Sequence, residues 1–332
     1  MKSLVTGAAG FIGSHLTDFL LDQGHKVVGI DNLSSGNVRN LDNAIMNDNF
    51  NLEIIDISKL EQLDSLSGPF DFVFHLAALA EIVPSIQNPN AYFQSNVIGT
   101  YNICQKAREF EVKKLVYTAS SSCYGIPNIL PTSEKSELSP QYPYALTKYL
   151  GEQVVLHWSR VYQLPSNSLR LFNVYGPRAR TTGSYGAVMG VFLAQMLNNK
   201  PLTIVGDGSQ KRDFTFVSDV VSALFSVANS NKSSEIYNVG SGNPRSVMDL
   251  ARMIGGKNFA FVPKRPGEPE QTFADISKIM RDLGWKPNVS LEEGISLILH
   301  SKHHWKDAPI WTPDLIAEAT SDWFKHLGSE NV

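Results

Sequence analysis

Tyr144 and Lys148 carry the side chains whose types and spacing most clearly suggest chemistry in this sequence. Residues four positions apart lie on one face of a helix, so the phenol and the ammonium group would be neighbours. Pro143, directly before the tyrosine, is typical of the first turn of a helix. A phenol has a pKa of about 10 in water, and a nearby ammonium group lowers this pKa. The pair is therefore predicted to take a proton from an alcohol, although an exposed helix can carry the same spacing by chance.

Three serines form a second candidate group, because Ser120, Ser121 and Ser122 closely follow the apolar segment 114–118. A hydroxyl at the end of a strand can hydrogen-bond the substrate oxygen that Tyr144 deprotonates. Ser120 is the first choice for this role, with Ser121 and Ser122 as alternatives. The alternative is that the three hydroxyls only form hydrogen bonds with the backbone of their own turn. None of these serines lies in a Gly-x-Ser-x-Gly motif, the nucleophile elbow of α/β-hydrolases, which excludes a serine hydrolase of that type.

Gly7, Gly10 and Gly13 lie between a short apolar segment and a helix-like segment that starts at Phe11. In a loop that binds a dinucleotide, the first glycine makes the turn and the second lets the backbone approach the pyrophosphate. The third lets the helix pack closely on the sheet. The N–H groups of Phe11 and Ile12 would then face the phosphates. The pattern predicts a dinucleotide site, and the alternative is a tight turn without a ligand.

Asp31 ends the strand-like segment 26–31, where a carboxylate can accept hydrogen bonds from the adenosine ribose. It would repel the 2′-phosphate of NADP, so NAD is the predicted cofactor, although Arg39 lies downstream. Asp56 follows the third strand-like segment and could either bind the adenine amino group or cap the following helix. After His75 the chain continues with residues that leave room for the cofactor ribose, and these are Leu76, Ala77 and Ala78.

The chain that must position these residues alternates strand-like and helix-like segments in its first half. The strand-like segments are 4–6, 26–31, 52–55, 72–76, 114–118 and 168–172, and a helix-like segment spans 11–23. This alternation predicts an α/β fold with a doubly wound parallel sheet, which binds ligands at the carboxyl ends of its strands. We expect residues 1–176 to form a Rossmann domain and residues 177–332 to form a smaller α/β lobe with a C-terminal helix. Later segments of about 213–240, strand-like at 213–217 and 235–239, are expected to return to the first domain.

Composition limits the class of protein. The chain has 332 residues, 42% of them hydrophobic and 18% charged, and a net charge of −3. Without a basic face or a run of like charge, nucleic acid is not an expected partner. Cys104 and Cys123 form no CxxC pair, so neither a disulfide framework nor a metal site is expected. No apolar run approaches the roughly 20 residues of a membrane helix, and the glycine loop comes too early for a signal peptide. We therefore expect no membrane association and a cytoplasmic location.

Together the motifs resemble the extended short-chain dehydrogenase/reductase family, and within it the nucleotide-sugar epimerases of the UDP-glucose and UDP-N-acetylglucosamine 4-epimerase type. The resemblance spans nearly all of residues 1–290, and the tail after about residue 300 lies outside the general pattern. The matching stretches are Gly7–Gly13, Asp31, Asp56–Ile57, His75–Ala78, Asn96–Thr100, Ser120–Gly125, Tyr144–Lys148, Phe172–Arg178, Arg212–Phe214 and Arg265–Glu268.

The resemblance implies a role for individual residues of this chain. Catalysis would depend on Ser120, Tyr144 and Lys148. The NAD site would comprise Gly7, Gly10, Phe11, Ile12, Gly13, Asp31, Asn32, Asp56, Ile57, Leu76, Ala77, Ala78 and Asn96, together with Tyr144 and Lys148. The UDP-sugar site would comprise Ser85, Ser121, Ser122, Asn173, Arg212, Arg265, Glu268 and Thr272, with no metal ion involved.

Within the UDP-sugar site, the resemblance assigns the diphosphate to Asn173, Arg212 and Arg265. It assigns the uridine ribose to Glu268 and a place near the sugar to Ser85. Planar guanidinium groups suit phosphate oxygens, and ordinary surface salt bridges are the alternative for both arginines.

The serine turn also bears on the reaction. In the family that this chain resembles, dehydratases carry Thr-Asp-Glu at the positions of Ser120 to Ser122, and decarboxylases carry Thr-Ser-Glu there. Hydroxyls alone cannot supply the general acid and base of an elimination. The expected function is therefore an NAD-dependent epimerase that interconverts UDP-hexoses at C4 through a 4-keto intermediate. The alternatives are a dehydratase, a decarboxylase or an epimerase on another sugar such as UDP-glucuronate and, in another class, a non-catalytic NAD-sensing scaffold.

Two further expectations follow from the resemblance. Thr272 stands where relatives face the 2-substituent of the sugar, and a residue this small would admit an N-acetyl group, the alternative being that it only lines a loop. The predicted pair is UDP-N-acetylglucosamine and UDP-N-acetylgalactosamine, with UDP-glucose and UDP-galactose left open. Family members usually pair through helices that correspond to 92–109 and 144–162, so a homodimer is expected. Val154, Val155 and Trp158 could supply its apolar surface, although packing in the core would use the same residues.

Overall fold

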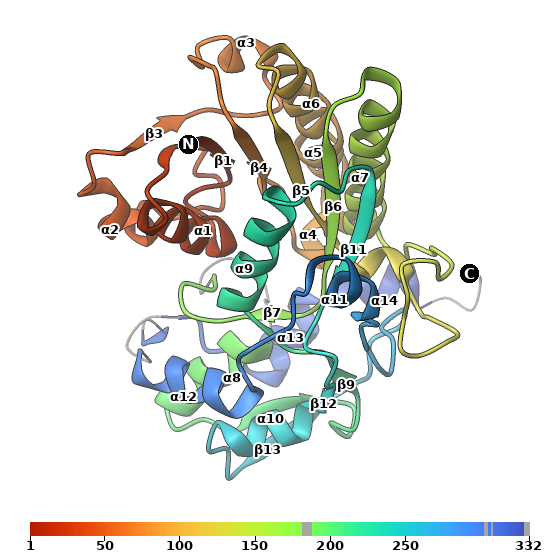
Figure 1. The fold of residues 1–332 in the computed structure, drawn as a ribbon. Coiled ribbons are helices and arrows are strands. Elements are labelled where there is room, and N and C mark those ends of the chain that lie inside the picture. Colours follow the sequence, from red (N-terminus) through yellow and green to blue (C-terminus); the bar gives the residue numbers. More distant parts are fainter. Residues whose placement is uncertain (181–187, 302–304, 307, 329–332) are drawn as a thin grey trace.

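The larger lobe is built on one parallel sheet, and the smaller lobe lies below it in Figure 1. The computed structural model describes residues 1–180, 188–301, 305–306 and 308–328. Within these residues the sheet has seven strands in the order β11-β6-β5-β4-β1-β2-β3, and all neighbouring pairs are parallel. The strands are β1 (Lys2–Thr6), β2 (Lys26–Asp31), β3 (Phe50–Ile54), β4 (Phe72–His75), β5 (Lys114–Ser120), β6 (Ser166–Leu171) and β11 (Glu235–Val239). The predicted doubly wound parallel sheet is confirmed.

The strand order reverses at β1, which pairs with β2 on one side and with β4 on the other. In open parallel sheets, ligands bind outside the carboxyl ends of the strands at such a point. Here the two strand ends are joined, because the Thr6 hydroxyl accepts hydrogen bonds from the N–H groups of Leu76 and Ala77 at 3.1 and 3.0 Å. Gly7 has a φ of +70°, and a Cβ on it would lie 2.8 Å from the Ala77 nitrogen, so this position requires glycine.

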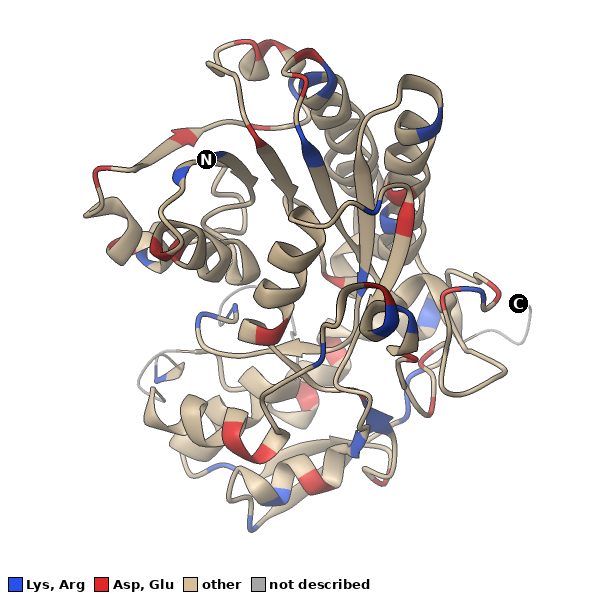
Figure 2. Ribbon diagram, viewed as in Figure 1, with Lys and Arg blue, Asp and Glu red and all other residues tan. Residues whose placement is uncertain are grey.

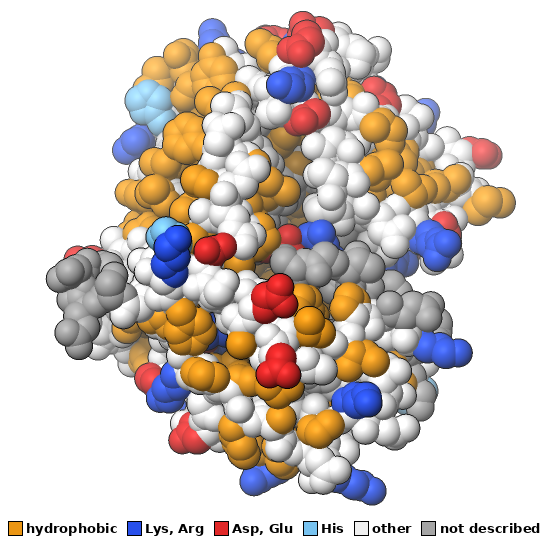
Figure 3. All heavy atoms as spheres, turned by 180° about the vertical axis from the view of Figure 1, so that it is seen from behind, with side chains coloured by type: hydrophobic (Ala, Val, Ile, Leu, Met, Phe, Trp, Pro, Cys, Tyr) orange, Lys and Arg blue, Asp and Glu red, His pale blue; other side chains and the backbone are white. Residues whose placement is uncertain are grey.

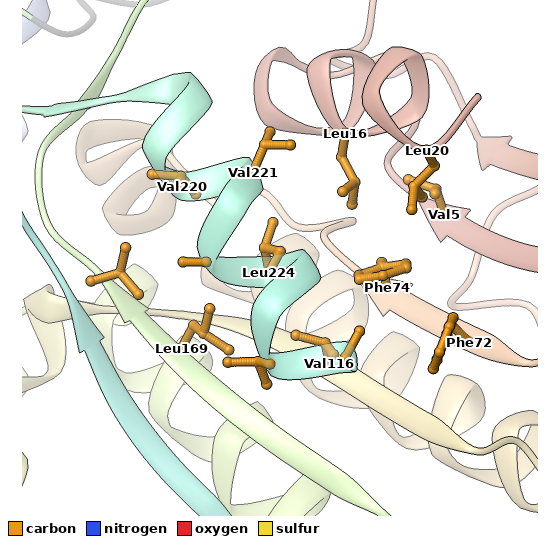
Figure 4. Close-up of a cluster of buried hydrophobic side chains, with 14 of the residues drawn as sticks. Val5, Leu16, Leu20, Phe72, Phe74, Val116, Leu169, Val220, Val221 and Leu224 are labelled. Carbon is orange, nitrogen blue, oxygen red and sulfur yellow. The ribbon is translucent and has the colours of Figure 1, made fainter. Parts of the chain in front are cut away.

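One face of the sheet is covered by α1 (Phe11–Asp22), α9 (Val217–Ala228) and α11 (Ser277–Leu283). Helix α9 buries Val217, Val220, Val221 and Leu224, whose spacing puts them on one side of a helix. Figure 4 shows how this helix and α1 meet the sheet. The labelled side chains of that cluster are Val5, Leu16, Leu20, Phe72, Phe74, Val116, Leu169, Val220, Val221 and Leu224.

The opposite face is covered by α6 (Gly99–Glu109) and α7 (Pro143–Tyr162), with α3 (Leu60–Leu63) beside them. This packing decides between the two alternatives given for Val155, a dimer surface and the core. Val155 has no exposed surface and lies in the core, because it faces the sheet. The remaining short helices of this lobe are α2 (Asp42–Ile45), α4 (Ile82–Gln87) and α5 (Pro89–Phe93), and a π-helical turn at Gln94–Ile98 joins α5 to α6.

The smaller lobe has its own hydrophobic core and three two-stranded sheets within the described residues. Its paired strands are β7 (Val174–Tyr175) with β10 (Thr215–Phe216), β9 (Lys211–Arg212) with β12 (Arg245–Ser246), and β8 (Leu202–Val205) with β13 (Phe259–Val262). Its helices are α8 (Val188–Leu197), α10 (Val247–Met253), α12 (Leu291–His300), α13 (Pro313–Ala319) and α14 (Ser321–Leu327).

The two strand-like segments expected to return to the first domain behave differently. Segment 235–239 forms β11 and pairs with β6 in the large sheet. Segment 213–217 forms no single strand there. The buried Asp213 carboxylate instead accepts hydrogen bonds from the N–H groups of Ser241, Gly242 and Ala274 and so stabilises two loops. The next residues form the short strand β10, which pairs with β7.

Charged residues of both signs are spread over both lobes in Figure 2. Among the helices of the described part, none combines the length and the apolar character needed to cross a bilayer.

A buried ion pair connects the helix that carries the candidate catalytic residues to β6 of the sheet. Arg170 on β6 donates to both carboxylate oxygens of Glu152 on α7, at 3.0 and 2.6 Å, and both side chains are almost fully buried. Ser168 donates to the same carboxylate at 2.8 Å. Arg170 also donates to the Tyr124 hydroxyl at 2.9 Å, which donates to Asn238 on β11. The interaction thus connects β6, α7, β11 and the turn after β5.

Replacing Glu152 by glutamine should destabilise the protein strongly, because it leaves the buried Arg170 guanidinium without its counter-charge. Breaking a buried pair in this way costs about 3–5 kcal/mol. Urea unfolding followed by circular dichroism measures the loss. The control is Glu109→Gln, whose carboxylate is 56% exposed in its ion pair with Lys106, and which should cost about 1 kcal/mol or less. Equal losses in the two variants would contradict the role given to Glu152.

Candidate active site

The candidate catalytic residues come from two adjoining elements. Helix α7 begins at Pro143, with Tyr142 as its extended N-cap, so Tyr144 and Lys148 lie in its first two turns. Strand β5 ends at Ser120 and continues into a 3₁₀ turn at Ser121–Tyr124. The turn packs against α7, which brings hydroxyl, phenol and amine to the carboxyl end of the sheet.

Of the three serines, the structure places Ser120 at the candidate base. The Ser120 hydroxyl is near enough to the Tyr144 phenol to act on its pKa, which it lowers, and it lies 2.8 Å from the Ser122 hydroxyl. The Ser122 side chain acts in the same direction on the pKa of Tyr142. The Ser120 oxygen also accepts the Ser122 N–H at 3.2 Å, so it shapes the turn as well as contacting the tyrosine. Ser121 takes no part in this set of contacts.

Lys148 is deeply buried, with 4% of its surface exposed, and its Nζ lies 4.5 Å from the centre of the Tyr117 ring. Burial lowers its pKa to about 7, and the negative charge of Glu152 acts in the opposite direction. Burial raises the pKa of Tyr144, against the effect of the Ser120 hydrogen bond. The expected lowering of the Tyr144 pKa by Lys148 is therefore wrong for the protein alone. Loss of hydration is the main cause of the raised pKa of Tyr144, and with a pKa of about 7 Lys148 is only partly protonated at neutral pH.

His75, at the end of β4, has a structural role. One ring nitrogen lies 2.7 Å from the Thr6 hydroxyl and the other 2.9 Å from the Thr100 hydroxyl. Complete burial, with a smaller contribution from Lys148, lowers its pKa to about 3. A histidine that stays neutral and is held at both nitrogens is suited to joining β1, β4 and α6.

The glycine loop has the geometry that a dinucleotide pyrophosphate requires. A Cβ on Gly13 would lie 2.0 Å from the Gly7 carbonyl oxygen, so only glycine allows α1 to approach β1 this closely. Helix α1 begins at Phe11. The N–H groups of Phe11, Ile12 and Gly13 belong to its first turn, where no intrahelical carbonyl precedes them, and they carry the positive end of the helix dipole.

A pocket at the carboxyl ends of β1, β2 and β4 brings most of the predicted cofactor residues together. Its lining includes Gly7, Gly10, Asp31, Asn32, Asp56, Ile57, Leu76, Ala77 and Ala78. Ile30, Ser34, Ser35, Ile55, Leu79 and Ser95 also line it, and sequence reasoning did not find them. The run Ser34-Ser35-Gly36 directly after the second strand was the available signal for part of this set. Such a pocket, next to a helix N-terminus, fits NAD.

The two acidic residues of this pocket are held by backbone N–H groups. The Asp31 carboxylate accepts from Ala9 at 3.0 Å and from Leu33 at 2.8 Å, and burial raises its pKa against these two bonds. An ionised carboxylate has further acceptor sites for ribose hydroxyls. Asp56 accepts from the Ser58 N–H and hydroxyl at 2.9 and 2.8 Å. Lys59, not Asp56, is the N-cap of α3, which removes the capping interpretation of Asp56.

Asn96 and Ser85 lie outside this pocket lining. The Asn96 amide bonds the Leu79 backbone through both its oxygen and its nitrogen and also donates to the Thr147 hydroxyl at 3.0 Å. It thereby supports the loop after β4 against α7. Ser85 is fully buried on α4, and its hydroxyl donates to the Ile82 carbonyl at 2.6 Å.

The residues predicted to bind the UDP-sugar form two contacting groups. Arg212 and Arg265 both reach the Glu268 carboxylate, at 3.4 and 3.2 Å. Two guanidinium groups around one carboxylate leave a net positive charge, which suits an anionic ligand. In the second group, the Thr272 hydroxyl donates to the Asn173 side-chain oxygen at 2.7 Å and accepts from the Asp213 N–H at 3.0 Å.

Sequence reasoning missed Tyr142 as a neighbour of the site. Its ring stacks on that of Tyr144 with centroids 6.4 Å apart and an angle of 7° between planes. Its place two residues before Tyr144 was the only sequence signal. Burial raises the pKa of Tyr142, and the charges of Glu268 and Arg212 also act on it, so this ring is near both Tyr144 and residues of the predicted UDP-sugar site. Within the described residues, no three potential metal ligands gather at one place.

Known proteins share both the sequence and the fold of this chain. Residues 3–240 match the NAD dependent epimerase/dehydratase family. A UDP-glucose 4-epimerase from Mycolicibacterium smegmatis is 39% identical over 304 residues, covering 89% of this chain and 96% of that protein. A UDP-glucuronic acid 4-epimerase from Bacillus cereus, solved with UDP-glucuronic acid and NAD, aligns with a TM-score of 0.83 and 34% identity, covering 92% of this chain and 99% of that one. A UDP-N-acetylglucosamine 4-epimerase from Methanobrevibacter ruminantium, solved with UDP-N-acetylmuramic acid, aligns with a TM-score of 0.83 and 32% identity, covering 90% and 98%.

The predicted cofactor is confirmed as NAD, because the family is NAD-dependent and a similar structure contains NAD. The glycine loop and the carboxylate of Asp31 fit that cofactor. Such a cofactor site, together with a serine–tyrosine–lysine group, is typical of enzymes of the extended short-chain dehydrogenase/reductase type. Since the match extends over most of the sequence, the chain belongs to the NAD dependent epimerase/dehydratase family.

Proposed function

We propose that the protein interconverts UDP-hexoses at C4, with UDP-N-acetylglucosamine and UDP-N-acetylgalactosamine as the substrate pair. The observation that carries the proposal is the serine turn, where Ser120 contacts Tyr144 and no carboxylate is present between Ser120 and Gly125. Proton transfer at a single hydroxyl is supported by this arrangement. Elimination or decarboxylation needs a further acid or base that the turn does not contain. A scaffold that only senses NAD would have no use for the serine–tyrosine–lysine group.

The chain's own groups would move one proton and hold the substrate. NAD, when bound, supplies an acceptor for the hydride from C4. Tyr144 would accept the proton of the 4-hydroxyl, while Ser120 hydrogen-bonds the same oxygen and Lys148 stabilises the phenolate. Arg212 and Arg265 would bind the diphosphate, keeping the sugar within reach of Tyr144. The 4-keto sugar would then turn over in the site, hydride would return to the other face of C4, and Tyr144 would return its proton to the C4 oxygen.

The identity of the sugar rests on Thr272. The relatives named above are enzymes of glucose, glucuronic acid and N-acetylglucosamine, so relatives at this level of identity differ in their sugar. Threonine leaves space that a tyrosine at the same place would fill. Its hydroxyl bond to Asn173 also places it beside a residue assigned to the diphosphate. The space at Thr272 favours a sugar with a large 2-substituent, such as an N-acetylated hexose, and UDP-glucuronate is the second candidate.

Tyr144→Phe should lower kcat by about 10²–10⁴-fold, because it removes the general base and keeps the ring. NMR of a panel of UDP-, GDP- and dTDP-sugars identifies the products, and calorimetry should give nearly unchanged UDP-sugar affinity. Tyr149→Phe, one turn further along α7, is the control and should keep normal turnover. Near-normal turnover by Tyr144→Phe would exclude the mechanism, and products of changed mass from the wild type would exclude an epimerase.

Thr272→Tyr should abolish turnover of the N-acetylated sugar, because it overfills the space for the 2-substituent. It should spare a plain UDP-hexose if the wild type accepts one. Thr272→Val is the matched control, since it loses the hydroxyl bonds to Asn173 and Asp213 but keeps the volume. Equal effects of valine and tyrosine would assign the loss to hydrogen bonding and remove the size argument.

A homodimer is a separate part of the proposal. Figure 3 shows hydrophobic side chains gathered at the upper left, over α6 and α7. Tyr101, Val161 and Tyr162 are 38%, 54% and 42% exposed. The rings of Tyr101 and Tyr162 both pack on Trp158, with centroids 5.4 and 5.3 Å away. An exposed aromatic surface on two adjacent helices is suited to pairing with a second copy.

Val161→Asp should shift the protein from dimer to monomer, because a charge would be buried in the interface. Sedimentation velocity at micromolar concentration measures the change. Ile129→Asp is the control, since Ile129 is 74% exposed on a loop away from these helices and its replacement should leave the dimer intact. A wild-type protein that sediments as a monomer would refute the homodimer.

A further inference from the structure

The C-terminal helix α14 contacts the turn that carries one of the two arginines of the UDP-sugar site. It lies beyond the residues matched by the family and, in Figure 1, at the junction of the two lobes. It packs against α4, and Gln87 donates to Asp322 at 2.8 Å. A Cβ placed on Gly267 would lie 3.9 Å from Leu327, so α14 borders the Arg265–Glu268 turn directly.

Trp323 is the residue of α14 that contacts this turn most closely. Its side chain is 3% exposed, and its indole N–H donates to the Pro266 carbonyl at 2.7 Å. The guanidinium carbon of Arg265 lies 5.4 Å from the centre of its ring, within range of a cation–π contact. The turn includes Gly267 at a φ of +74°, a backbone conformation that residues with a side chain rarely adopt.

Trp323 also contacts the aromatic side of the candidate active site. The Tyr142 ring lies 6.1 Å from Trp323, and Tyr142 stacks in turn on Tyr144. Trp323 is therefore in contact with two groups, the turn that holds Arg265 and the ring next to the base. Packing alone would explain a buried indole. It would not explain why the N–H is directed at the carbonyl of this turn while the ring face meets its arginine.

We propose that Trp323 is a positioning residue that fixes the Arg265–Glu268 turn in the conformation that binds the substrate diphosphate. This rests on the proposed function, which assigns Arg265 to the diphosphate. The hydrogen bond to Pro266 would hold the backbone of the turn, and the ring would hold the guanidinium. The C-terminal segment would thus be a part of the UDP-sugar site, and it would act on binding without touching the reacting atoms.

The test measures UDP affinity by calorimetry, together with KM, kcat and NAD content, on the full-length protein. Trp323→Phe removes the N–H bond and keeps a ring, and should raise the Kd for UDP and KM by about two- to tenfold. Trp323→Ala removes both contacts and should raise them by about tenfold or more. In both variants kcat should stay within about twofold and NAD content should be normal. Trp285→Phe is the matched control, because it loses an indole bond to Ser222 in the core of the other lobe, and its UDP affinity should equal that of the wild type.

The outcomes separate this inference from the proposed function. A wild type that does not bind UDP overturns both. A wild type that binds UDP, with equal affinity in Trp323→Phe and Trp323→Ala, overturns only the role of Trp323. A fall in kcat at unchanged UDP affinity, or a joint loss of UDP and NAD binding, also overturns it, because a positioning residue of this turn affects UDP alone. If Trp323→Ala does not fold, Trp323→Phe decides the question.

Discussion

The buried ion pair between Arg170 and Glu152 determines where the candidate catalytic residues stand. Because burying an unpaired charge is costly, the Arg170 guanidinium and the Glu152 carboxylate must be paired, and this pairing fixes the position of α7 against β6. Because Glu152 is one helical turn beyond Lys148, the same contact orients Lys148 and Tyr144. The Arg170 bond to Tyr124 holds the turn that follows Ser120. Ser120, Tyr144 and Lys148 therefore lie close together because one ion pair connects the elements that carry them.

The same burial sets the acid–base behaviour of the site. In the protein alone, loss of hydration raises the pKa of Tyr144 and lowers that of Lys148 to about 7. Both groups thus tend toward their neutral forms near pH 7. A phenol in such a place ionises when positive charge is close to it, which Lys148 and an oxidised nicotinamide would provide. Proton removal would then be tied to the presence of the oxidised cofactor, which suits a reaction in which hydride leaves a carbon and the proton leaves the hydroxyl oxygen on that carbon.

The parts of the fold that sequence could predict are those with local signals. Gly7, Gly10 and Gly13 lie within one turn and one helix start, and the alternating apolar segments predicted the parallel sheet. The direction of the Tyr144 pKa was wrong because spacing along a helix does not reveal burial. The segment 213–217 has the composition of a strand, yet the Asp213 carboxylate binds three loop N–H groups. Trp323 meets Pro266 across 57 residues, a contact with no signal in either segment.

The two halves of the site differ in how they are assembled, and this difference has a consequence for specificity. Most of the cofactor pocket comes from consecutive loops after β1, β2, β3 and β4, which the sheet holds in fixed positions. Five of the candidate UDP-sugar residues, Asn173, Arg212, Arg265, Glu268 and Thr272, come instead from loops and the short strand β9 outside the large sheet, and α14 packs against the Arg265–Glu268 turn. Changes in these loops leave the hydrogen bonds of the sheet intact. A chain of this design can therefore keep its cofactor and its proton transfer while its sugar pocket changes, and the C-terminal helix would be one more element through which the pocket can change.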